Sequence, residues 1–562
     1  MKRKGTEILM QVLKDEGVDT IFGYPGGAVL DIYDELERTD IRHILVRHEQ
    51  GAVHAADGYA RASGKVGVCL VTSGPGATNT VTGIASAYMD SIPLVVLTGQ
   101  VNTSLIGNDA FQEVDIVGIT RPCTKHNYLV KDIKDLSRTI KEAFFLARSG
   151  RPGPVLIDLP KDQMQASIDY KPLGHIKMRS YNPTYEPNEK QLKRVIKLIQ
   201  QAKRPLIFTG GGVILAGASK ELAQFTKTIQ APVTSTLMGL GCYPASDSKW
   251  LGMIGMHGTF SANMSSAECD LMIAIGVRFD DRVTGHVGTF ASKAKIIHID
   301  IDPTSISKNV PVHTPIVGDC RITLTRLNSL LKEEDFKAPK GSRKDWFNQL
   351  EAWKSSAPMT YGQMKNKIKP QFVVEKLYEL TRGKAIVATE VGQNQMWAAQ
   401  YYHFNDPNTF ITSGGLGVMG FGLPAAIGAQ VACPDKTVIN IAGDGSIQMN
   451  IQEMATAVQH CLPVKIAILN NRYLGMVRQW QELFYDKCYA STNMEHAPDF
   501  VKLAEAYGAV GLRASKPEEV EAVIKKGLDT KGPVIMEFVV EREEGVYPMV
   551  PAGASITDML LV

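Results

Sequence analysis

The sequence predicts an α/β protein made of three doubly wound parallel sheets. In three stretches, short apolar segments rich in β-branched residues alternate with longer segments whose apolar residues keep helical spacing. This alternation is typical of parallel sheets with helices on both faces. One proline-rich stretch and one charged stretch, neither of them periodic, separate the three. A length of 562 residues also suggests three or four domains. The domains expected are 1–169, 189–331 and 370–545, with a tail at 546–562.

In the first domain, the segments expected to be strands are 20–23, 43–46, 66–71, 94–97 and 154–158. Residues 6–16 before them are amphipathic, which predicts a surface helix rather than the apolar centre of a signal peptide. Two glycine-rich loops, 23–28 and 73–79, each join a strand to a helix. Glu49 follows the second strand and begins a helix, where a carboxylate favours the helix dipole. Taken alone, the loops and Glu49 have these ordinary structural explanations.

In the second domain, the expected strands are 205–209, 271–275 and 295–301. The charged segment 332–369 is expected to be a linker with some helix. In the third domain, 437–442 and 463–469 are expected strands, because each is a short apolar run rich in β-branched residues. The residues between them keep helical spacing across 447–458, which predicts a single helix there.

The turn after the first of these two strands suggests a metal site. Asp444 lies between Gly443 and Gly445, and Asn471 follows the next strand, 27 residues later. Because a strand–helix–strand unit returns with fixed handedness, both strand ends meet at one edge of the sheet. One carboxylate and one amide oxygen suit Mg²⁺, which fills its remaining positions with phosphate oxygens and water. G-D-G alone is more often an ordinary turn, and its spacing to the Asn pair favours the metal site.

Composition excludes several classes of protein. A net charge of +3, from 61 basic and 58 acidic residues, leaves no electrostatic footprint for nucleic acid or an anionic membrane. Eight cysteines are scattered without a C-x-x-C pair, which indicates reduced thiols in a cytoplasmic protein. No uncharged apolar run approaches about 18 residues, so no membrane span is expected.

The G-D-G and N-N pattern, taken with Glu49, resembles that of thiamine-diphosphate (ThDP) enzymes. The resemblance implies that Glu49 hydrogen-bonds the aminopyrimidine ring and favours the tautomer that deprotonates the thiazolium carbon. It also implies that the first domain binds the pyrimidine of ThDP and the third domain the diphosphate with Mg²⁺. Family members bind ThDP between subunits, and Glu49 and Asp444 lie in different domains. An obligate dimer is therefore implied.

Longer motifs make the chain similar, over essentially its whole length, to the acetohydroxyacid synthases, also called acetolactate synthases. The motifs are 107–113, 153–162, 278–282 (R-F-D-D-R), 414–417 with 419–424, and 474–480. The resemblance implies a biosynthetic catalytic subunit that decarboxylates pyruvate on ThDP and transfers the hydroxyethyl unit to a second 2-keto acid. Pyruvate as acceptor gives 2-acetolactate, and 2-ketobutyrate gives 2-aceto-2-hydroxybutyrate, both in branched-chain amino-acid biosynthesis. This closer resemblance, to the biosynthetic enzymes, also implies FAD in the second domain, a homodimer or homotetramer, and a small regulatory subunit.

The resemblance assigns site residues one by one. The ThDP residues are Gly26, Gly27, Glu49, Val391, Gly392, Gln393, Gly417, Met419, Gly445, Ser446, Tyr473 and Met476. The metal ligands are Asp444, Asn471 and the main-chain carbonyl of Tyr473. The FAD residues are Arg151, Gly211, Gly212, Met256, His257, Gly258, Thr259, Arg278, Asp300, Ile301, Asp319 and Cys320. The catalytic residues are Glu49, Gln112, Lys161, Arg282 and Trp480.

Some of these residues carry a stated role. Met419 is expected to hold ThDP bent, although methionine in an apolar loop is otherwise a gap filler. Arg282 is expected to pair with the carboxylate of the second keto acid, for which a planar guanidinium is suited. Met476, Val477 and Trp480 share one face of an expected helix, with Trp480 against the extra methyl of 2-ketobutyrate. Core packing is the alternative for these three residues.

The chain departs from the family pattern at a few positions. Glu390 and Asn394 stand where Asp and His are common, and Asn394 is expected to donate to the diphosphate instead. Tyr473, with Arg472 before it, replaces a frequent histidine. The run 210–212 is not G-x-G-x-x-G and is a weak dinucleotide signal. Two alternatives stay open: an FAD-dependent pyruvate oxidase of the same architecture, and a non-catalytic binding module.

Overall fold

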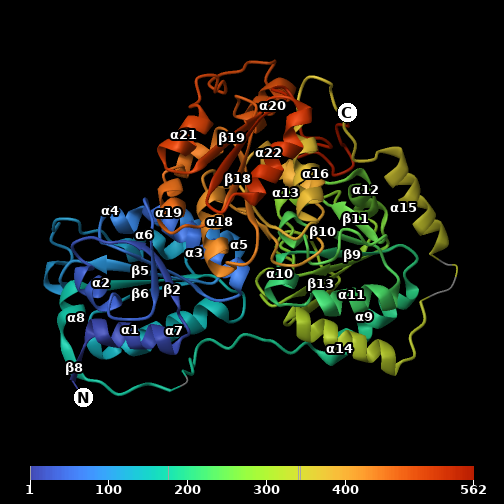
Figure 1. Ribbon diagram of the computed structural model, residues 1–562. Coiled ribbons are helices and arrows are strands. Elements are labelled where there is room, and N and C mark those ends of the chain that lie inside the picture. The colour runs from blue at the N-terminus through green and yellow to red at the C-terminus, as the bar shows by residue number, and fades with distance from the viewer. Residues whose placement is uncertain (1, 175, 339–340, 342, 562) are drawn as a thin grey trace.

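The computed structural model describes residues 2–174, 176–338, 341 and 343–561 and contains three six-stranded sheets. Neighbouring strands within each of these sheets are parallel. Figure 1 shows the first domain (blue) beside the middle domain (green), with the third (orange) above and between them. A separate antiparallel pair joins β1 (Lys2–Lys4) to β8 (Ser167–Asp169). The predicted fold class, three parallel-sheet α/β domains, is confirmed.

The first sheet has helices on both faces. In spatial order its strands are β3 (Arg42–Leu45), β2 (Thr20–Tyr24), β4 (Gly67–Val71), β5 (Leu94–Gln100), β7 (Pro154–Pro160) and β6 (His126–Leu129). One face packs on α1 (Gly5–Asp15), α2 (Leu30–Leu36), α7 (Ile133–Arg148) and α8 (Lys161–Gln165). The other packs on α3 (Glu49–Ser63), α4 (Pro75–Thr78), α5 (Val81–Asp90) and α6 (Ile116–Thr120).

The middle sheet runs β11 (Trp250–Met253), β10 (Val233–Ser235), β9 (Pro205–Thr209), β12 (Leu271–Ile275), β13 (Lys295–Asp300) and β14 (Thr314–Val317). One face packs on α9 (Glu189–Gln201), α10 (Gly211–Leu215), α11 (Ser219–Ile229) and α14 (Cys320–Glu333). The other packs on α12 (Phe260–Glu268), α13 (Asp281–Thr284) and α15 (Lys344–Ser356). Counted within the domain, the strand order is 3-2-1-4-5-6, so the order reverses between β9 and β12.

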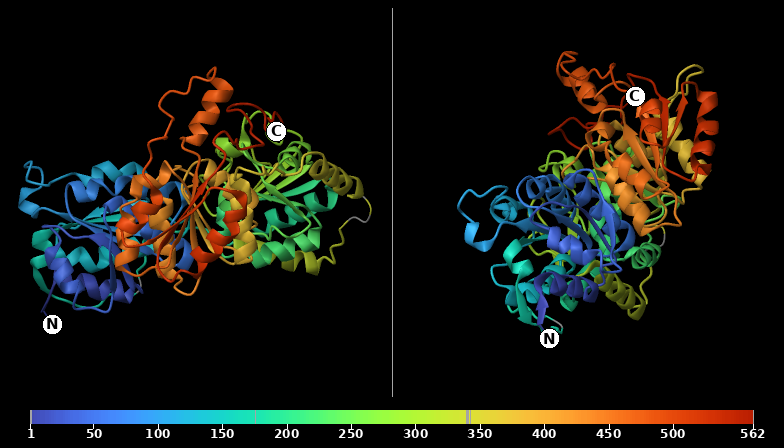
Figure 2. Two further views of the ribbon diagram at one scale, coloured as in Figure 1. Left: turned by 45° about the horizontal axis from the view of Figure 1, so that its top comes forward. Right: turned by 60° about the vertical axis from the view of Figure 1, so that its left-hand side comes forward.

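The third sheet runs β16 (Phe410–Ile411), β15 (Ile386–Thr389), β17 (Val438–Gly443), β18 (Lys465–Asn470), β20 (Val534–Val539) and β19 (Val510–Ala514). One face packs on α16 (Pro370–Thr381), α17 (Gln393–Tyr401) and α22 (Pro517–Asp529). The other packs on α18 (Gly422–Ala432), α19 (Glu453–Gln459) and α21 (Phe500–Ala506). Helix α20 (Gly475–Phe484) stands above the sheet (Figures 1 and 2). Counted in the same way, the first and third sheets share the order 2-1-3-4-6-5.

The single helix predicted across 447–458 is wrong. The chain forms a 3₁₀ segment, η4 (Ser446–Asn450), and only then α19. Two tertiary hydrogen bonds explain the break: Asn450 Nδ2 donates to the Gly420 carbonyl (2.7 Å), and Glu453 Oε1 accepts from the backbone N–H of Arg47 (3.0 Å). Bonds to distant backbone groups therefore override local helical spacing at this point.

Glycines bring α3 and α18 together, so that the first and third domains pack tightly within one chain. A Cβ on Gly428 would lie 1.8 Å from the Ala55 carbonyl oxygen, and a Cβ on Gly58 would lie 2.1 Å from the Ala425 carbonyl oxygen. Residue numbers rise along one helix as they fall along the other, so the helices are antiparallel. Glu49, nine residues before Gly58, therefore lies about 13 Å along α3 from this contact, in the direction of the C-terminus of α18.

Helix α15, inside the segment expected to link two domains, packs on the middle sheet. Trp346 is 2% exposed, and its Nε1 donates to the Pro205 carbonyl at 3.1 Å. We expect Trp346→Ala to lower the free energy of unfolding by about 3–5 kcal/mol, because it removes a buried ring and leaves a cavity. Urea denaturation followed by circular dichroism measures this change. Asn348→Ala, on the exposed side of the same helix, is the control, and equal effects of both substitutions would contradict this packing.

Candidate functional site

Asp444 and Asn471 lie at the carboxyl ends of neighbouring parallel strands. Asp444 directly follows β17, Asn471 directly follows β18, and Gly443 is paired with Leu469 in the register. The Asp444 carboxylate is fully buried, and neither oxygen has a hydrogen-bond partner among the described residues. Burial raises its pKa to about 7. Asn471 turns its amide nitrogen to Gln393 Oε1 (3.2 Å), while its Oδ1 accepts from the Tyr473 N–H (3.1 Å).

This donor set fits a hard cation. Buried carboxylate oxygens without partners are unfavourable, and a cation would satisfy them. One carboxylate with amide and main-chain oxygens is a set that Mg²⁺ takes when phosphate and water complete its shell. The backbone of Gly475 lies close against two side chains of the site, because a Cβ there would lie 2.6 Å from Asn471 Nδ2 and 2.0 Å from Gln393 Oε1. Gly445 and Ser446 continue the same turn into η4.

Glu390 and Asn394 brace the neighbouring strand end. The fully buried Glu390 carboxylate accepts from the backbone N–H groups of Gly420 (2.7 Å) and Leu423 (2.9 Å). Burial raises the pKa of Glu390 to about 7. Asn394 Nδ2 donates to the carbonyls of Glu390 (2.8 Å) and Ile441 (2.9 Å). The expectation that Asn394 donates to a diphosphate is therefore wrong, because both of its N–H groups already have backbone acceptors.

Glu49 is the first residue of α3, after the N-cap His48. Its Oε2 accepts from Asn79 Nδ2 at 2.9 Å, and a Cβ on Gly76 would lie 3.3 Å from its other oxygen. The predicted glycine-rich loop 73–79 thus lies against Glu49. At the same edge of the first sheet, Lys161 Nζ donates to the Gly27 carbonyl (3.1 Å).

Gly26 and Gln112, two further residues predicted for the site, each make a close contact within the first domain. A Cβ on Gly26 would lie 2.6 Å from the Thr72 side chain. Gln112, in the left-handed region with φ 58°, packs its backbone against Gly74, where a Cβ would lie 2.7 Å from the Gln112 carbonyl oxygen. These contacts belong to the first domain and form a group separate from the Asp444 turn.

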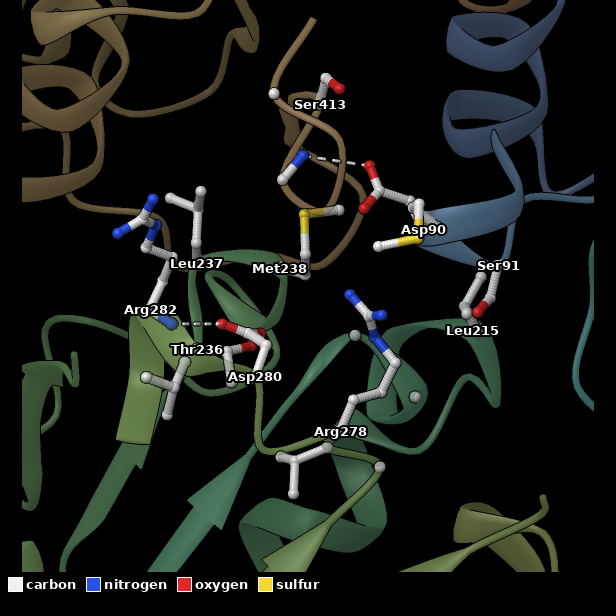
Figure 3. A pocket seen from close by; sticks show the side chains of 18 of the residues that line it. Asp90, Ser91, Leu215, Thr236, Leu237, Met238, Arg278, Asp280, Arg282 and Ser413 are labelled. Carbon is white, nitrogen blue, oxygen red and sulfur yellow. Dashed lines mark hydrogen bonds between the residues drawn. The ribbon is translucent and has the colours of Figure 1, made fainter. Parts of the chain in front are cut away.

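A cavity of about 590 Å³ lies where the middle domain meets the third domain and helix α5 (Figure 3). It is lined by most of the residues expected to hold FAD, by part of the ThDP set and by two of the catalytic set. These are Arg151, Gly211, Gly212, Met256, His257, Arg278, Asp300, Ile301, Asp319, Cys320, Val391, Gly392, Gly417, Met419, Met476, Arg282 and Trp480.

Two of the predicted FAD residues turn away from this cavity. Gly258 and Thr259 are not among its lining residues. The Thr259 hydroxyl instead caps α12 by accepting from the Ala262 N–H (3.2 Å), and it donates to the Leu251 carbonyl (2.5 Å). Thr259 therefore supports the start of α12 and does not form part of the cavity wall.

The other predicted residues outside the cavity lie in two places. Glu49, Gly26, Gly27, Gln112 and Lys161 belong to the first domain, and Gln393, Asp444, Gly445, Ser446, Asn471 and Tyr473 surround the Asp444 turn. Within one chain, the first-domain group therefore does not share the cavity with Met419 and Trp480.

The cavity lies at the point where the strand order of the middle sheet reverses. Gly211 and Gly212 follow β9, and Arg278 follows β12. A Cβ on Gly212 would lie 2.6 Å from Gly276 Cα, so the two turns touch through their backbones. The Arg278 guanidinium points into the cavity (Figure 3) and makes no side-chain hydrogen bond within the described part of the chain. Doubly wound sheets bind ligands at such reversal points.

Arg282 and Trp480 meet on the cavity wall. The Arg282 guanidinium carbon lies 5.6 Å from the centre of the Trp480 ring, a cation–π contact, and the Arg282 side chain is 57% exposed. Met476, Val477 and Trp480 all line the cavity from α20, as their shared helix face predicted. Only Met476 also packs on the core of the third domain, and Val477 is 52% exposed.

The sequence did not single out several residues of the cavity. Asp90, Thr236, Met238 and Ser413 line it without belonging to any motif used above, and Asp280 lines it from within the R-F-D-D-R run, where only Arg278 and Arg282 were assigned roles. Asp90 ends an apolar helix, and nothing in its local sequence predicts a buried carboxylate at a domain junction. Thr236 and Met238 follow a short strand, and position after a strand is the one signal that could have identified them.

Comparison with known proteins agrees with this geometry. The chain matches the thiamine pyrophosphate enzyme N-terminal TPP-binding domain over residues 3–119, the central domain over 192–327 and the C-terminal TPP-binding domain over 390–538. Three parallel sheets with a carboxylate–amide pair at adjacent strand ends therefore place it among the thiamine pyrophosphate enzymes.

Relatives that match the chain over nearly its whole length identify its family among the thiamine pyrophosphate enzymes. The chain is 52% identical to the acetolactate synthase isozyme 3 large subunit of Escherichia coli, over 99% of this chain and 98% of that protein. It is 50% identical to the acetolactate synthase large subunit of Haemophilus influenzae (100% and 98%) and 48% identical to acetolactate synthase 2, chloroplastic, of Nicotiana tabacum (99% and 85%). The chain belongs to the family of acetolactate synthase large subunits. These relatives favour an enzyme with acetolactate synthase activity over both a pyruvate oxidase and a non-catalytic binding module.

The part of the chain that the structure describes contains no helix that is both long enough and apolar enough to cross a membrane.

Proposed function

We propose that this acetolactate synthase binds ThDP through Mg²⁺ held by Asp444, Asn471 and the main-chain carbonyl of Tyr473. The observation that carries the proposal is the Asp444 carboxylate, which is fully buried, has no partner among the described residues and lies beside Asn471. When bound, ThDP supplies an electron sink for the bond electrons that remain on pyruvate after CO₂ leaves. The residues of this chain position that group and its substrates.

The test is acetolactate formation from pyruvate by cofactor-stripped protein. ThDP, Mg²⁺ and FAD are added singly, in pairs and together. We expect no product without both ThDP and Mg²⁺. Full activity with ThDP in the presence of a strong chelator would contradict the metal assignment.

We further propose that each active site is built from two chains of a homodimer, with Glu49 of one chain serving the Asp444 turn of the other. Two observations support this arrangement. Glu49 lies toward the C-terminus of α18, whereas Met419 precedes the N-terminus of that helix. Beside Gln112, Phe111 is 88% exposed, an apolar ring without cover in the single chain.

Mixing two inactive variants tests the shared site. When Glu49→Gln and Asp444→Ala chains are denatured and refolded together, a mixed dimer has one site with both native residues. We therefore expect activity to return in the mixture and in neither variant alone. If the mixture stays as inactive as its components, each site belongs to a single chain. A return of activity in a tetramer would still support a two-chain site, and light scattering separates the two assemblies.

For the acceptor step, the chain provides Arg282 and Trp480. Arg282 presents an exposed guanidinium at the cavity, which suits bidentate pairing with the carboxylate of pyruvate or 2-ketobutyrate. The half-buried Trp480 ring beside it gives an apolar wall for the alkyl group of that acceptor. Both keto acids carry the carboxylate, and only 2-ketobutyrate carries the extra methyl group.

We expect Trp480→Leu to reduce the preference for 2-ketobutyrate over pyruvate by about tenfold or more, because one methylene in an apolar pocket is worth about 1–3 kcal/mol. Decarboxylation of the first pyruvate should be largely unchanged. The ratio of the two products in a competition between the keto acids measures this effect. Phe484→Leu is the control, because Phe484 packs edge-on against Trp480 (6.1 Å between ring centres) outside the cavity. An unchanged product ratio in Trp480→Leu would indicate that Trp480 serves only in packing.

We propose that the cavity of the middle domain holds FAD. The strand order 3-2-1-4-5-6 is the doubly wound order that binds dinucleotides where the order reverses. There Gly211 and Gly212 allow close approach of a pyrophosphate, and Arg278 offers a guanidinium without another partner among the described residues. Because the function is a synthase, pyruvate should bleach the bound flavin little in the absence of oxygen. Rapid stoichiometric bleaching would still require bound FAD, but it would contradict a synthase in which FAD takes no net electrons.

We also propose that the chain assembles with a small regulatory subunit and that it is located in the cytoplasm. The bacterial relatives are named large subunits, which supports a smaller partner for this chain. All eight cysteines are free thiols, as expected in a reducing compartment. Co-purification of the chain with a co-expressed small subunit from the same genome tests the first point, and no change in elution volume would contradict it.

A further inference from the structure

Two residues on one face of α5 hold a turn of the third domain. Ser86 and Asp90 lie four residues apart in the helix and therefore point to the same side. The Ser86 and Ser413 hydroxyls are hydrogen-bonded at 2.9 Å. The Asp90 carboxylate accepts from the backbone N–H groups of Gly414 (3.1 Å) and Gly415 (2.8 Å). Helix α5 of the first domain thus fastens the turn 413–415 at three points.

Asp90 is a buried charge whose partners are limited. Its side chain is fully buried, and Arg61 Nη2 lies 3.0 Å from its Oδ2. The same guanidinium also pairs with the buried Asp57 at 2.5 Å, so one arginine serves two carboxylates. The pair of N–H groups from the turn provides the remaining stabilisation of Asp90. A buried carboxylate of this kind binds its backbone donors firmly, because losing them leaves charge without a partner.

The fastened turn forms a wall of the cavity. Ser413, Gly414 and Gly417 line it, and Met419 follows in the same loop. A Cβ on Gly415 would lie 2.9 Å from Asp90 Oδ1 and 3.2 Å from Arg278 Nη2, so both side chains lie close to the turn. Figure 3 shows Asp90 directed toward the turn that carries Ser413, with Arg278 below. The turn therefore contacts α5, lies beside Arg278, which is proposed for FAD, and leads to Gly417 and Met419, which are proposed for ThDP.

We infer that Asp90 is a positioning residue, which fixes the turn 413–415 to α5 and thereby sets the position of Gly417 and Met419 toward ThDP. The inference rests on the proposed placement of ThDP beside those two residues. Asp90 itself touches neither reacting atoms nor substrate in this account. It acts through two backbone N–H groups, and Ser86 supports it.

The test compares Asp90→Asn with Asp57→Asn. Both substitutions weaken pairing with Arg61, because both oxygens of Asp57 accept from its guanidinium. Only Asp90→Asn also places a donor –NH₂ group against a donor N–H of the turn, because each Asp90 oxygen accepts from Gly414 or Gly415. We expect Asp90→Asn to raise the ThDP concentration for half-maximal activity by about tenfold, while kcat at saturating ThDP is largely retained. Asp57→Asn should change that concentration little, even though both variants lose thermal stability.

Hydrogen exchange gives a readout that does not depend on activity. In protein without ThDP, the Gly414 and Gly415 amides should exchange faster in Asp90→Asn and remain protected in Asp57→Asn. Equal effects of the two variants on exchange and on ThDP dependence would overturn the inference, because Asp90 would then act only through general stability. Faster exchange with unchanged ThDP dependence would also overturn it. Failure of the proposed ThDP site is recognised separately, because Asp444→Ala would then leave ThDP binding intact.

Discussion

Glu49→Gln is expected to lower the turnover number for acetolactate formation by roughly two to four orders of magnitude, the scale of a positioned acid–base group. In the proposed site, the Glu49 carboxyl group would hydrogen-bond the aminopyrimidine ring and would thereby favour the tautomer that can remove a proton. A carboxamide has the same shape and lacks the charge. Gln can still accept the Asn79 bond that Glu49 makes at 2.9 Å, so α3 and the loop beside it should keep their places.

Steady-state kinetics at saturating ThDP and Mg²⁺ measure the loss, and quenching of tryptophan fluorescence measures ThDP affinity. We expect affinity to stay within a few-fold, because the diphosphate and metal contacts belong to the third domain. Asn79→Ala is the companion variant. It keeps the charge and removes one orienting bond, so its loss should be smaller, about tenfold. Unchanged turnover in Glu49→Gln would remove this residue from the mechanism.

Local sequence patterns predicted those strands whose bounds depend on nearby residues. The strands at 205–209 and 271–275 have the same bounds as β9 and β12, because both are short apolar runs bounded by turn residues and buried on both faces. The meeting of Asp444 with Asn471 was also predictable, since a right-handed crossover brings neighbouring parallel strand ends to one edge. The metal chemistry proposed for them rests on residue type and on the burial of Asp444.

Features decided by long-range contacts were not predictable. The weak glycine run at 210–212 gave no sign of the strand order 3-2-1-4-5-6, because order depends on which strands pair and not on their composition. Asn394 was expected to be a free donor, yet the carbonyls of Glu390 and Ile441 occupy both of its N–H groups. Asp90 reaches its partners in the turn 413–415 across more than 300 residues of sequence. Such pairings leave no periodic signal in the chain.

Asp444→Ala is expected to weaken Mg²⁺ and ThDP binding together, each by about 100-fold or more, because even residues that only support a metal ligand cost 10–100-fold when removed. Losing the metal also loses the diphosphate, which Mg²⁺ holds in the proposed site. Titration of ThDP at fixed Mg²⁺, and of Mg²⁺ at fixed ThDP, measures both affinities by fluorescence. An unchanged ThDP affinity would reject Asp444 as a metal ligand.

The same carboxylate should be unfavourable for the metal-free protein, and this gives Asp444 a second and opposite effect. It is fully buried with no hydrogen-bond partner among the described residues, and burial raises its pKa to about 7. The isosteric Asp444→Asn removes the charge without leaving a cavity. We therefore expect the metal-free form of Asp444→Asn to unfold at a higher temperature than the metal-free parent, with a free energy of unfolding greater by about 1–3 kcal/mol.

The parent should gain stability when Mg²⁺ and ThDP are added, and Asp444→Asn should gain none. If Asp444→Asn unfolds earlier than the parent without metal, the carboxylate has a structural partner, and its assignment as a site kept for a cation is wrong.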